Sequence, residues 1–206
     1  VQRLDIWNNQ GGAGITPANF QGVEVALDFS TPDAVVDNIT RVAALGVNLV
    51  VGTTGWHGRM EEVRAAVERH GTGLVYGSNF SIGVNVFYRV VAEAARLLKD
   101  RPEYDPWVYE IHHRQKLDAP SGTALKLREV LRKEYGERQI AVASARAGTI
   151  PGTHTVGFDS EADTLTLTHA ARSRKGFALG ALGTARWIRG KKGFYEFSEV
   201  LFGKDM

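Results

Sequence analysis

The sequence contains no cysteine among its 206 residues. This absence excludes disulfide bonds, thiolate metal sites and a cysteine nucleophile. No apolar run approaches the roughly 18 residues that a membrane-spanning helix needs, and no signal peptide opens the chain. The chain also has no large excess of charge of one sign. Its 25 basic and 23 acidic side chains give a net charge of +2, too little to indicate a nucleic-acid partner. We therefore expect a soluble cytoplasmic protein with no nucleic-acid or membrane partner.

Proline is sparse as well, at 6 residues, whereas glycine is frequent, at 23. This balance is typical of α/β proteins, which have many tight turns between strands and helices. Hydrophobic residues make up 43% of the chain, enough to bury the core of one large or two small domains.

Strand and helix patterns alternate in the first part of the chain. Residues 23–29, 47–51 and 73–76 read as buried strands. Between them we predict a helix that begins at Ser30-Thr31-Pro32 and ends at Gly46, and a second helix over residues 59–68. This order predicts a Rossmann-like parallel sheet covered by helices.

The pattern changes after Asn79. The elements predicted there are helices over 83–98, 121–135 and 176–188, strands over 107–112, 140–144, 153–158 and 164–169, and an aromatic tail over 194–202. Alternation in the last three strands favours a largely antiparallel sheet. The predicted fold class is therefore α/β plus α+β, with a mixed or antiparallel sheet in the second domain.

The opening of the chain is anomalous. Residues 1–6 look like a short strand, and Gly11-Gly12-Ala13-Gly14 invites interpretation as a phosphate-binding loop. However, this run lacks the G-x-G-x-x-G spacing, and Pro17 and Gly22 come too soon for an amphipathic helix to follow. We interpret it as an ordinary loop.

The most informative stretch is Tyr109–Ala124. A strand delivers His112 and His113, Lys116 follows, and the chain enters a helix through Asp-Ala-Pro-Ser-Gly-Thr. The first N–H groups of that helix, from residues 121–123, have no partner within the helix, and its dipole adds partial positive charge. Glycine at 122 permits close approach, and the hydroxyl of residue 123 adds a donor. The stretch predicts a carboxylate or phosphate site with an acid–base group beside it.

Two other interpretations of this stretch remain open. Pro-Ser-Gly-Thr before an apolar helix is also good helix capping, and one histidine of such a pair is often simply buried. A metal site is the second alternative, with four candidate ligands: His112, His113, His154 and His169. Adjacent histidines on a strand point to opposite faces and cannot easily bind one ion, so we expect no metal.

The residues Glu110–Ala124 resemble the signature of the dihydrodipicolinate reductase family, E-x-H-H-x-x-K-x-D-A-P-S-G-T-A, at every fixed position. Further segments resemble the same family in the right order: residues 28–32, 52–55, 77–85, 146–148 with 151–154, and 173–174 with 177–178. The resemblance extends from about Asp28 to the end of the chain.

The resemblance implies reduction of dihydrodipicolinate (4-hydroxy-tetrahydrodipicolinate) to tetrahydrodipicolinate by NADPH or NADH, in lysine and diaminopimelate biosynthesis. It implies that His112 is the general acid and that Lys116 supplies charge and shares proton delivery. The substrate is a small dicarboxylate, and the residues implied to bind it are His113, Lys116, Ser121, Gly122 and Thr123. For the second carboxylate, Arg146 is a candidate, although a surface ion pair is an equally good interpretation of it.

The residues implied to bind the cofactor are Asp5, Phe29, Gly52, Thr53, Thr54, Gly77, Ser78, Asn79, Phe80 and Arg174. Simple turn chemistry is an alternative for residues 52–54, and a solvent-facing charge is an alternative for Arg174. The implied domains are a dinucleotide-binding domain (1–80 and 175–206) and a domain for substrate binding and tetramerisation (81–174). The family therefore implies a homotetramer.

The chain departs from the family at its beginning, because the strand, G-x-x-G-x-x-G turn and helix that bind the pyrophosphate have no match. We expect an N-terminally truncated form, in which Asp5 lies where an acidic residue grips the adenine ribose. Such a chain would bind cofactor poorly and turn over slowly or not at all, although its substrate domain should fold. Two alternatives remain: a related Rossmann-type dehydrogenase, such as diaminopimelate dehydrogenase, and a non-catalytic dicarboxylate-binding module.

Overall fold

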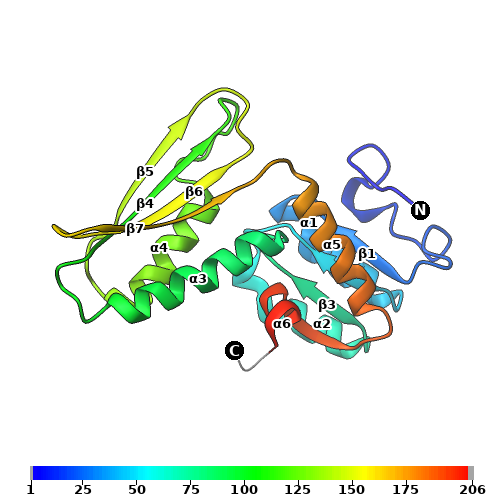
Figure 1. The fold of residues 1–206 in the computed structure, drawn as a ribbon. Helices are drawn as coiled ribbons and strands as arrows, with labels where there is room; N and C mark the ends of the chain where they lie inside the picture. Colours follow the sequence, from blue (N-terminus) through cyan, green and yellow to red (C-terminus); the bar gives the residue numbers. More distant parts are fainter. Residues whose placement is uncertain (1, 204–206) are drawn as a thin grey trace. The chain divides into compact units, whose positions relative to one another are not determined.

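The protein is represented by a computed structural model that describes residues 2–203. The chain divides into two compact units, residues 1–80 with 178–206 and residues 81–177. Each unit is described by itself (Figure 1). The assignment of cofactor binding to the first unit, and of substrate binding and tetramerisation to the second, remains a prediction.

The first unit contains a four-stranded parallel sheet with the order β1-β2-β3-β8. Its strands are β1 (Val25–Asp28), β2 (Asn48–Val51), β3 (Gly73–Tyr76) and β8 (Gly193–Glu196). Its helices are η1 (Gln10–Gly12), α1 (Pro32–Ala44), η2 (His57–Arg59), α2 (Met60–Arg69), α5 (Lys175–Ile188) and α6 (Phe197–Phe202). The predicted Rossmann-like parallel sheet is confirmed.

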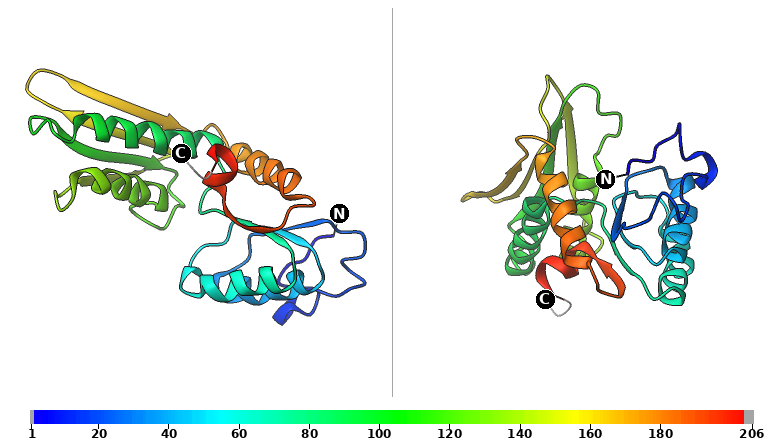
Figure 2. Two further views of the ribbon diagram at one scale, coloured as in Figure 1. Left: turned by 90° about the horizontal axis from the view of Figure 1, so that it is seen from below. Right: turned by 90° about the vertical axis from the view of Figure 1, so that its right-hand side faces the viewer.

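Helices cover both faces of this sheet (Figure 2). Leu49 and Val51 of β2 pack with α1 and α2, whereas Val50 between them packs with α5 on the opposite face. Successive side chains of a strand point to opposite faces, so a strand with helices on both sides is apolar throughout. All four residues of β2 are accordingly buried.

Helix α1 begins and ends where the sequence predicts. Thr31 is the N-cap and Pro32 occupies the first turn, where its missing N–H has no helical partner in any case. The helix ends at Ala44, and Gly46 follows with a φ of 74°, which favours glycine.

The predicted strand over residues 1–6 is wrong for its described part, residues 2–6, which form an extended segment leading into a turn. The Asp5 carboxylate accepts a hydrogen bond from Trp7 N–H, and the Asn8 side chain accepts one from Asp5 N–H. Short polar side chains offer the backbone these local partners in place of a sheet ladder. Asp5 therefore lies in a turn, and its role in ribose binding stays a prediction.

The second unit contains a mixed four-stranded sheet with the order β5-β4-β6-β7. Its strands are β4 (Asp105–His112), β5 (Ala141–Arg146), β6 (Thr153–Asp159) and β7 (Thr164–Ala170), and its helices are α3 (Ile82–Leu98) and α4 (Gly122–Tyr135). Strands β4, β6 and β7 pair antiparallel, as predicted, but β5 pairs parallel with β4. The reason is that α4 connects β4 to β5, and such a crossover returns the chain in the same direction.

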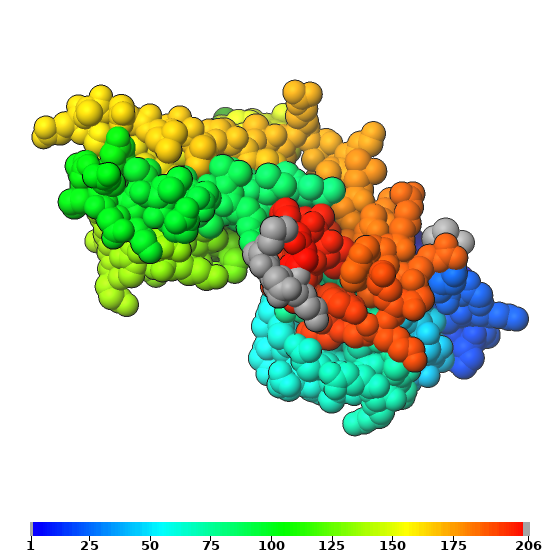
Figure 3. Space-filling model, turned by 60° about the horizontal axis from the view of Figure 1, so that its bottom comes forward, coloured from blue at the N-terminus to red at the C-terminus, as the bar shows by residue number. Residues whose placement is uncertain are grey.

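Helices α3 and α4 pack side by side against one face of this mixed sheet (Figure 1). Val108 and Val156 lie opposite each other on that face and are fully enclosed with Leu127 and Leu131 of α4. In the space-filling view the side chains of α3, in green, lie along the surface of this unit (Figure 3).

Among the described residues no helix is both long and apolar enough to cross a membrane.

Candidate active site

A buried carboxylate, Glu110, lies at the centre of the charged residues of the second unit. It sits on β4, opposite Ser144 of β5 on one side and His154 of β6 on the other. Because alternate residues of a strand share a face, His112 lies on the same face as Glu110, and Arg146 pairs with His112 across the sheet. The register of three strands thus brings a carboxylate, two imidazoles and a guanidinium together.

The two oxygens of Glu110 have different partners. Oε1 accepts hydrogen bonds from the Ser121 backbone N–H at 3.0 Å and from Arg146 at 2.9 Å. Oε2 faces the two histidines, at 2.7 Å from His112 Nδ1 and 3.8 Å from His154 Nε2. Burial by itself raises the pKa of Glu110, but hydrogen bonds from Ser121, Arg146 and Ser144 outweigh it and lower the pKa to about 2. The side chain is therefore an anion at neutral pH.

The two ring nitrogens of His112 face different surroundings. Nδ1 faces Glu110, whereas Nε2 faces Gly152, where an added Cβ would lie 2.8 Å from it. Burial lowers the pKa of His112, the Glu110 charge raises it, and Lys116 and Arg146 lower it further. The net direction is downward, so the imidazole is mostly neutral at pH 7 until another negative charge arrives.

His154 extends this network toward the start of α4. Its Nε2 lies 3.2 Å from the Ser121 hydroxyl, and its ring makes an edge-on contact with the ring of His112 at 5.0 Å between centroids. Burial, followed by repulsion from His112, lowers the pKa of His154 to about 4. His154 is therefore a neutral hydrogen-bonding group near pH 7.

The start of α4 has the predicted cap, but the Ser121 N–H, which we expected to be unpaired, donates to Glu110 Oε1. Ser121 is the N-cap, and its hydroxyl accepts a hydrogen bond from Ala124 N–H at 3.2 Å. Within the described part of the chain, a Cβ added to Gly122 would meet no heavy atom within 4 Å, so this position is open to a ligand. The Thr123 side chain forms a hydrogen bond with Tyr88, whose pKa burial raises to about 12.

Lys116 and His113 lie in the segment between β4 and α4. The Lys116 ammonium group forms an ion pair with Asp118 at 2.7 Å and is about one quarter exposed. His113 Nδ1 lies 3.1 Å from the Gln115 side-chain oxygen, and His113 N–H donates to Ile150 O at 2.7 Å. His112 is buried and His113 is only partly so, which confirms that the two histidines differ in environment.

Arg146 forms a largely buried ion pair and not a surface one, and its role toward the second substrate carboxylate stays a prediction. Its guanidinium group donates to Glu110, to Ala145 O at 2.6 Å and to Asp118 O. A buried carboxylate needs such a partner, because an unpaired ion in the interior is costly. This interaction leaves the second carboxylate partner of the substrate unassigned.

The histidines considered as metal ligands do not gather as one set. Among residues 2–203, the group that could hold an ion consists of Glu110, His112 and His154, whose ligand atoms lie within 4.8 Å of one another. Arg146 already supplies a positive charge 2.9 Å from the same carboxylate. A second cation there would be repelled, so we interpret the group as a cluster of one carboxylate and two imidazoles without a metal, and the expectation of no metal stays a prediction.

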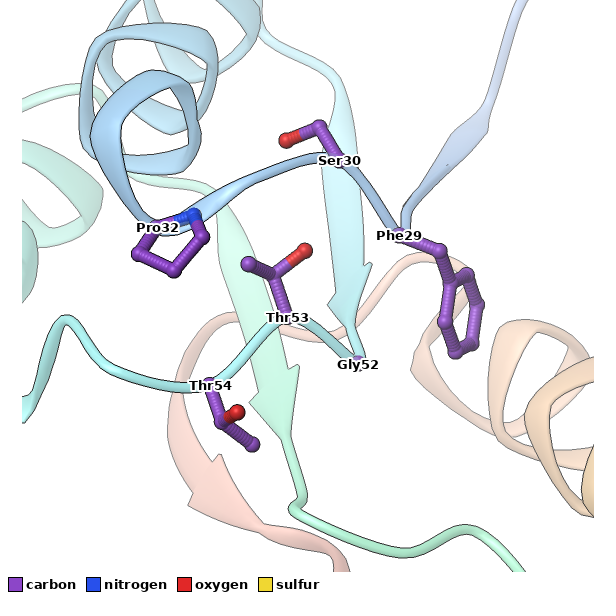
Figure 4. Close-up of a pocket in the computed structure, with 6 residues that line it drawn as sticks. All are labelled: Phe29, Ser30, Pro32, Gly52, Thr53 and Thr54. Atoms are coloured by element: carbon purple, nitrogen blue, oxygen red, sulfur yellow. The ribbon is translucent and has the colours of Figure 1, made fainter. Parts of the chain in front are cut away.

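In the first unit, four of the residues proposed for cofactor binding come together. Phe29, Gly52, Thr53 and Thr54 line a pocket of about 240 Å³ with Ser30 and Pro32. Figure 4 shows the loops after β1 and β2 side by side, with the Thr53 side chain between them. The absence of a side chain at 52 is required, because a Cβ there would lie 2.0 Å from the Phe29 ring.

Asp28 holds these two loops together. Its Oδ1 accepts hydrogen bonds from Ser30 N–H at 3.0 Å, from the Ser30 hydroxyl at 2.8 Å and from the Thr53 hydroxyl at 3.0 Å. Its Oδ2 accepts one from the Asn38 amide at 3.0 Å. The Thr53 hydroxyl is thus used within the protein, and cofactor binding by residues 52–54 stays a prediction.

The other residues proposed for the cofactor are placed differently. Gly77 lies against Phe197, and Phe80 is 2% exposed, with its ring 4.7 Å from that of Phe197 and 6.1 Å from that of Phe29. Ser78 and Asn79 lie in the loop between them. Arg174 is exposed just before α5 and belongs to the other unit, so its role in cofactor binding stays a prediction.

Sequence reasoning did not identify Glu110 and Asp28 as central residues. Each is an acidic residue in an otherwise apolar strand, and this signal was available at both positions. Their partners, however, come from neighbouring strands, and only the register reveals them.

Two family models match the chain: "Dihydrodipicolinate reductase, N-terminus" over residues 15–80 and "Dihydrodipicolinate reductase, C-terminus" over residues 83–201. Among curated proteins, the 4-hydroxy-tetrahydrodipicolinate reductase of Christiangramia forsetii is 38% identical over 87% of this chain and 80% of its own length. The protein of the same name from Methanoregula boonei is 40% identical over 93% of this chain and 86% of its own length.

Among solved structures, a dipicolinate-bound dihydrodipicolinate reductase from a Paenisporosarcina species superposes with a TM-score of 0.76. It is 22% identical, and the match covers 98% of this chain and 88% of that one, so it supports the fold alone. The family models together span residues of both units, and the curated relatives share well over 30% identity across most of their length. This chain therefore belongs to the dihydrodipicolinate reductase family.

Proposed function

We propose that this chain catalyses the NAD(P)H-dependent reduction of 4-hydroxy-tetrahydrodipicolinate to tetrahydrodipicolinate in lysine and diaminopimelate biosynthesis. The curated relatives that cover most of the chain carry the name of this reductase. The observation that supports the proposal most directly is the arrangement of a buried imidazole, His112, beside a helix start that is open at Gly122.

His112 is the proposed general acid. Addition of hydride to a conjugated imine leaves an electron-rich carbon that must receive a proton. In this step the proton leaves Nε2 of the imidazolium and forms a bond to carbon, and His112 becomes neutral. An approaching dicarboxylate raises the pKa of His112, since its negative charge opposes the effect of burial. Substrate binding thus charges the acid that the reaction needs.

The start of α4 is the proposed site for one substrate carboxylate. The N–H groups of the first turn, the opening at Gly122 and the ammonium group of Lys116 all favour an anion there. Asp118 pairs with Lys116 in the absence of substrate, and a substrate carboxylate would compete for that ammonium group. We include His113, Ser121 and Thr123 in this proposed site through their positions around the same loop.

The pocket of the first unit is the proposed site of the nicotinamide end of the cofactor. The loops that line it are fixed by Asp28, and the Phe29 ring packs closely against Gly52, which has no side chain. These features suit a flat ring carrying a carboxamide, which needs backbone partners and an apolar contact. The cofactor supplies the hydride, and both NADH and NADPH remain candidates.

The family's homotetramer is a further part of this proposal. Strands β5 and β7 form the two edges of the mixed sheet, and Leu165 of β7 is 44% exposed. An exposed edge strand pairs readily with another chain. Light scattering coupled to size-exclusion chromatography would test this expectation, and a monomer at micromolar concentration would contradict it.

The reductase assay that tests the proposal uses freshly generated substrate and follows nicotinamide absorbance with NADH and with NADPH. We expect turnover that falls by about 100-fold or more in His112→Gln, the loss typical of removing a general acid. The matched control is His70→Gln, an exposed histidine at the end of α2, which should leave the rate unchanged. A folded protein without activity toward this substrate, with either cofactor, would contradict the proposed function.

A further inference from the structure

We propose that Glu110 is a positioning residue that fixes the tautomer and the orientation of His112 and joins this acid to the anion-binding start of α4. The inference rests on the proposed function for its catalytic consequence. Its structural content concerns only the second unit, where all of the residues involved lie.

The inference rests on the different partners of the two Glu110 carboxylate oxygens. Oε2 lies 2.7 Å from His112 Nδ1 as an ion-pair contact, and neither atom has a hydrogen-bond partner in the described structure. A proton on Nδ1 favours this approach, because the lone pair of an unprotonated nitrogen would be repelled by a carboxylate. A neutral His112 is then protonated on Nδ1, and its Nε2 faces Gly152 on the other side of the ring. When the ring is charged, the second proton resides on Nε2, the nitrogen that does not face the carboxylate.

The other oxygen connects this acid to the proposed carboxylate site. Oε1 accepts the backbone N–H of Ser121, and the hydroxyl of the same serine caps α4 through Ala124 N–H. One carboxylate therefore contacts both the proton donor and the first residue of the helix start. Displacement of Glu110 would move the acid relative to the substrate that it protonates.

A buried ion pair alone is the competing explanation. Arg146 donates to Oε1, and a pair of this kind could serve only to satisfy two charges in the interior. That role requires no contact between the carboxylate and His112. The position of Oε2, turned away from Arg146 and toward both imidazoles, favours the positioning role.

Several charged groups face His112, and Glu110 is the one that opposes burial most strongly. Burial lowers the pKa of His112, Glu110 raises it, and Lys116 and Arg146 lower it. Two further groups act on it from neighbouring elements: Asp118, which raises the pKa, and His154, whose ring contacts that of His112. Loss of the Glu110 charge should therefore leave His112 neutral over a wider pH range.

The test is Glu110→Gln, which keeps the shape of the side chain and removes its charge. An amide can accept from Ser121 and Arg146 through its oxygen, but its NH₂ group then faces His112 Nδ1. We expect the neutral ring of His112 to change from the Nδ1–H to the Nε2–H tautomer, and its pKa to fall. Nitrogen NMR of imidazole-labelled protein, titrated with pH in the absence of substrate and cofactor, measures both quantities.

Kinetics supply the second measurement. We expect kcat at pH 7 to fall by about 100-fold in Glu110→Gln, with the cofactor KM unchanged and the pH profile of kcat displaced to lower pH. Glu129→Gln makes the same chemical change on the exposed face of α4 and should leave the pKa of His112 and the value of kcat as they are.

The outcomes separate the inference from the proposed function. A folded Glu110→Gln protein in which His112 keeps its tautomer and pKa would overturn the positioning role, whatever its activity. If the NMR changes occur but the unsubstituted protein does not reduce the substrate, the positioning role stands and the proposed function fails. If Glu110→Gln does not fold, Glu110→Asp replaces it: retracting the carboxylate should still change the His112 pKa measurably, and an unchanged pKa would refute the inference.

Discussion

Gly180 of α5 lies directly against the backbone carbonyl group of Phe80, so that a Cβ added to Gly180 would stand 1.7 Å from that oxygen. Only a residue without a side chain permits this approach of the helix. We expect Gly180→Ala to lower the free energy of unfolding by about 1–3 kcal/mol or more, because backbone cannot move aside as a flexible side chain can. Chemical denaturation monitored by circular dichroism measures the change.

Gly183, one turn further along the same helix, is the control for this substitution. Nothing in the described structure lies within 4 Å of a Cβ at this position, and the residue is exposed. Gly183→Ala should therefore raise stability by up to about 1 kcal/mol through helix propensity alone. Equal effects of the two substitutions would show that the contact with Phe80 does not limit the position of α5.

The buried imidazole of His154 predicts a loss of stability in mild acid. Its pKa is 6.5 in the unfolded chain and about 4 in the fold, so the neutral form is the one that folding favours. The contribution of His154 to the free energy of unfolding is fully present above pH 6.5 and is lost as pH falls from 6.5 through 4. In this range the unfolded chain binds a proton at His154 while the folded chain does not, so acid favours unfolding. The shift corresponds to about 3 kcal/mol as an upper value.

The lowered pKa of Glu110 leads us to expect a second, separate loss of stability at lower pH. Its pKa falls from 4.5 to about 2 on folding, so its contribution is present above pH 4.5 and is lost as pH falls through 2. Urea unfolding between pH 7 and pH 3 should show both regions. In His154→Gln the first decline should be weaker and the second should persist, whereas His70→Gln on the surface should change neither. A stability that is constant from pH 6.5 to pH 4 in the unsubstituted protein would refute the prediction.

Gly152 should prove sensitive to a single methyl group. Its φ of 148° is unusual for other residues, and a Cβ would lie 2.8 Å from His112 Nε2, the nitrogen that delivers the proton in the proposed reaction. We expect kcat to fall at least 10-fold in Gly152→Ala, while the cofactor KM stays the same. Steady-state kinetics with either cofactor would measure this split.

Gly148 lies in the same loop and provides the comparison. It also has a positive φ, 53°, but within the described residues no atom comes within 4 Å of a Cβ there. Gly148→Ala should thus cost about 1–2 kcal/mol of stability through backbone strain and leave kcat nearly unchanged. A similar loss of kcat in both variants would mean that loop strain, and not obstruction of His112, is responsible.

Asp28 should control cofactor binding without touching the cofactor. Its carboxylate accepts hydrogen bonds from both loops that line the pocket of the first unit. In Asp28→Asn one acceptor oxygen becomes a donor, so Ser30, Asn38 and Thr53 can no longer all be satisfied. We expect the cofactor KM to rise about 10-fold while the substrate KM changes little, a loss of the size of one such hydrogen bond.

Asp37→Asn supplies the control for this experiment. Asp37 lies on the same helix that follows Asp28, but its side chain is 70% exposed and pairs only distantly with Arg59, at 3.9 Å. Both KM values should remain as they are in the unsubstituted protein. The prediction requires that Asp28→Asn raise the KM of the cofactor more than the KM of the dicarboxylate substrate. An equal rise in both KM values would contradict it and would indicate a general destabilisation of the fold.

The sequence predicted those elements whose ends carry local signals. Pro32 and Gly46 bound α1, and Ser121 caps α4, because each of these residues acts on the backbone at its own position. A mixed sheet was among the predicted possibilities, but which of its strands would pair parallel was not, since alternation along a strand is the same whichever way its neighbour runs. The strand expected over residues 1–6 was wrong because Asp5 and Asn8 satisfy the backbone locally.

The candidate site was predictable only in part, for a related reason. Four residues of the candidate site lie within one short stretch of sequence: His112, Lys116, Ser121 and Gly122. Their spacing alone was therefore enough to predict an anion site with an acid–base group. The partners of Glu110 come from β5, β6 and α4, up to 44 residues away in sequence at His154 (154 − 110 = 44). Such a network depends on strand register, which composition and spacing do not determine.

The pairing of β3 with β8 brings together residues 73–76 and 193–196, with the whole of the second unit between them in sequence. During synthesis the second unit, residues 81–177, is complete before the first unit has its fourth strand. Until β8 is made, the far edge of β3 has no partner, and until α5 is made the apolar side chains that this helix covers remain exposed. The nascent chain therefore carries an unfinished sheet at its leading end while the proposed proton-donating unit already has every residue it requires.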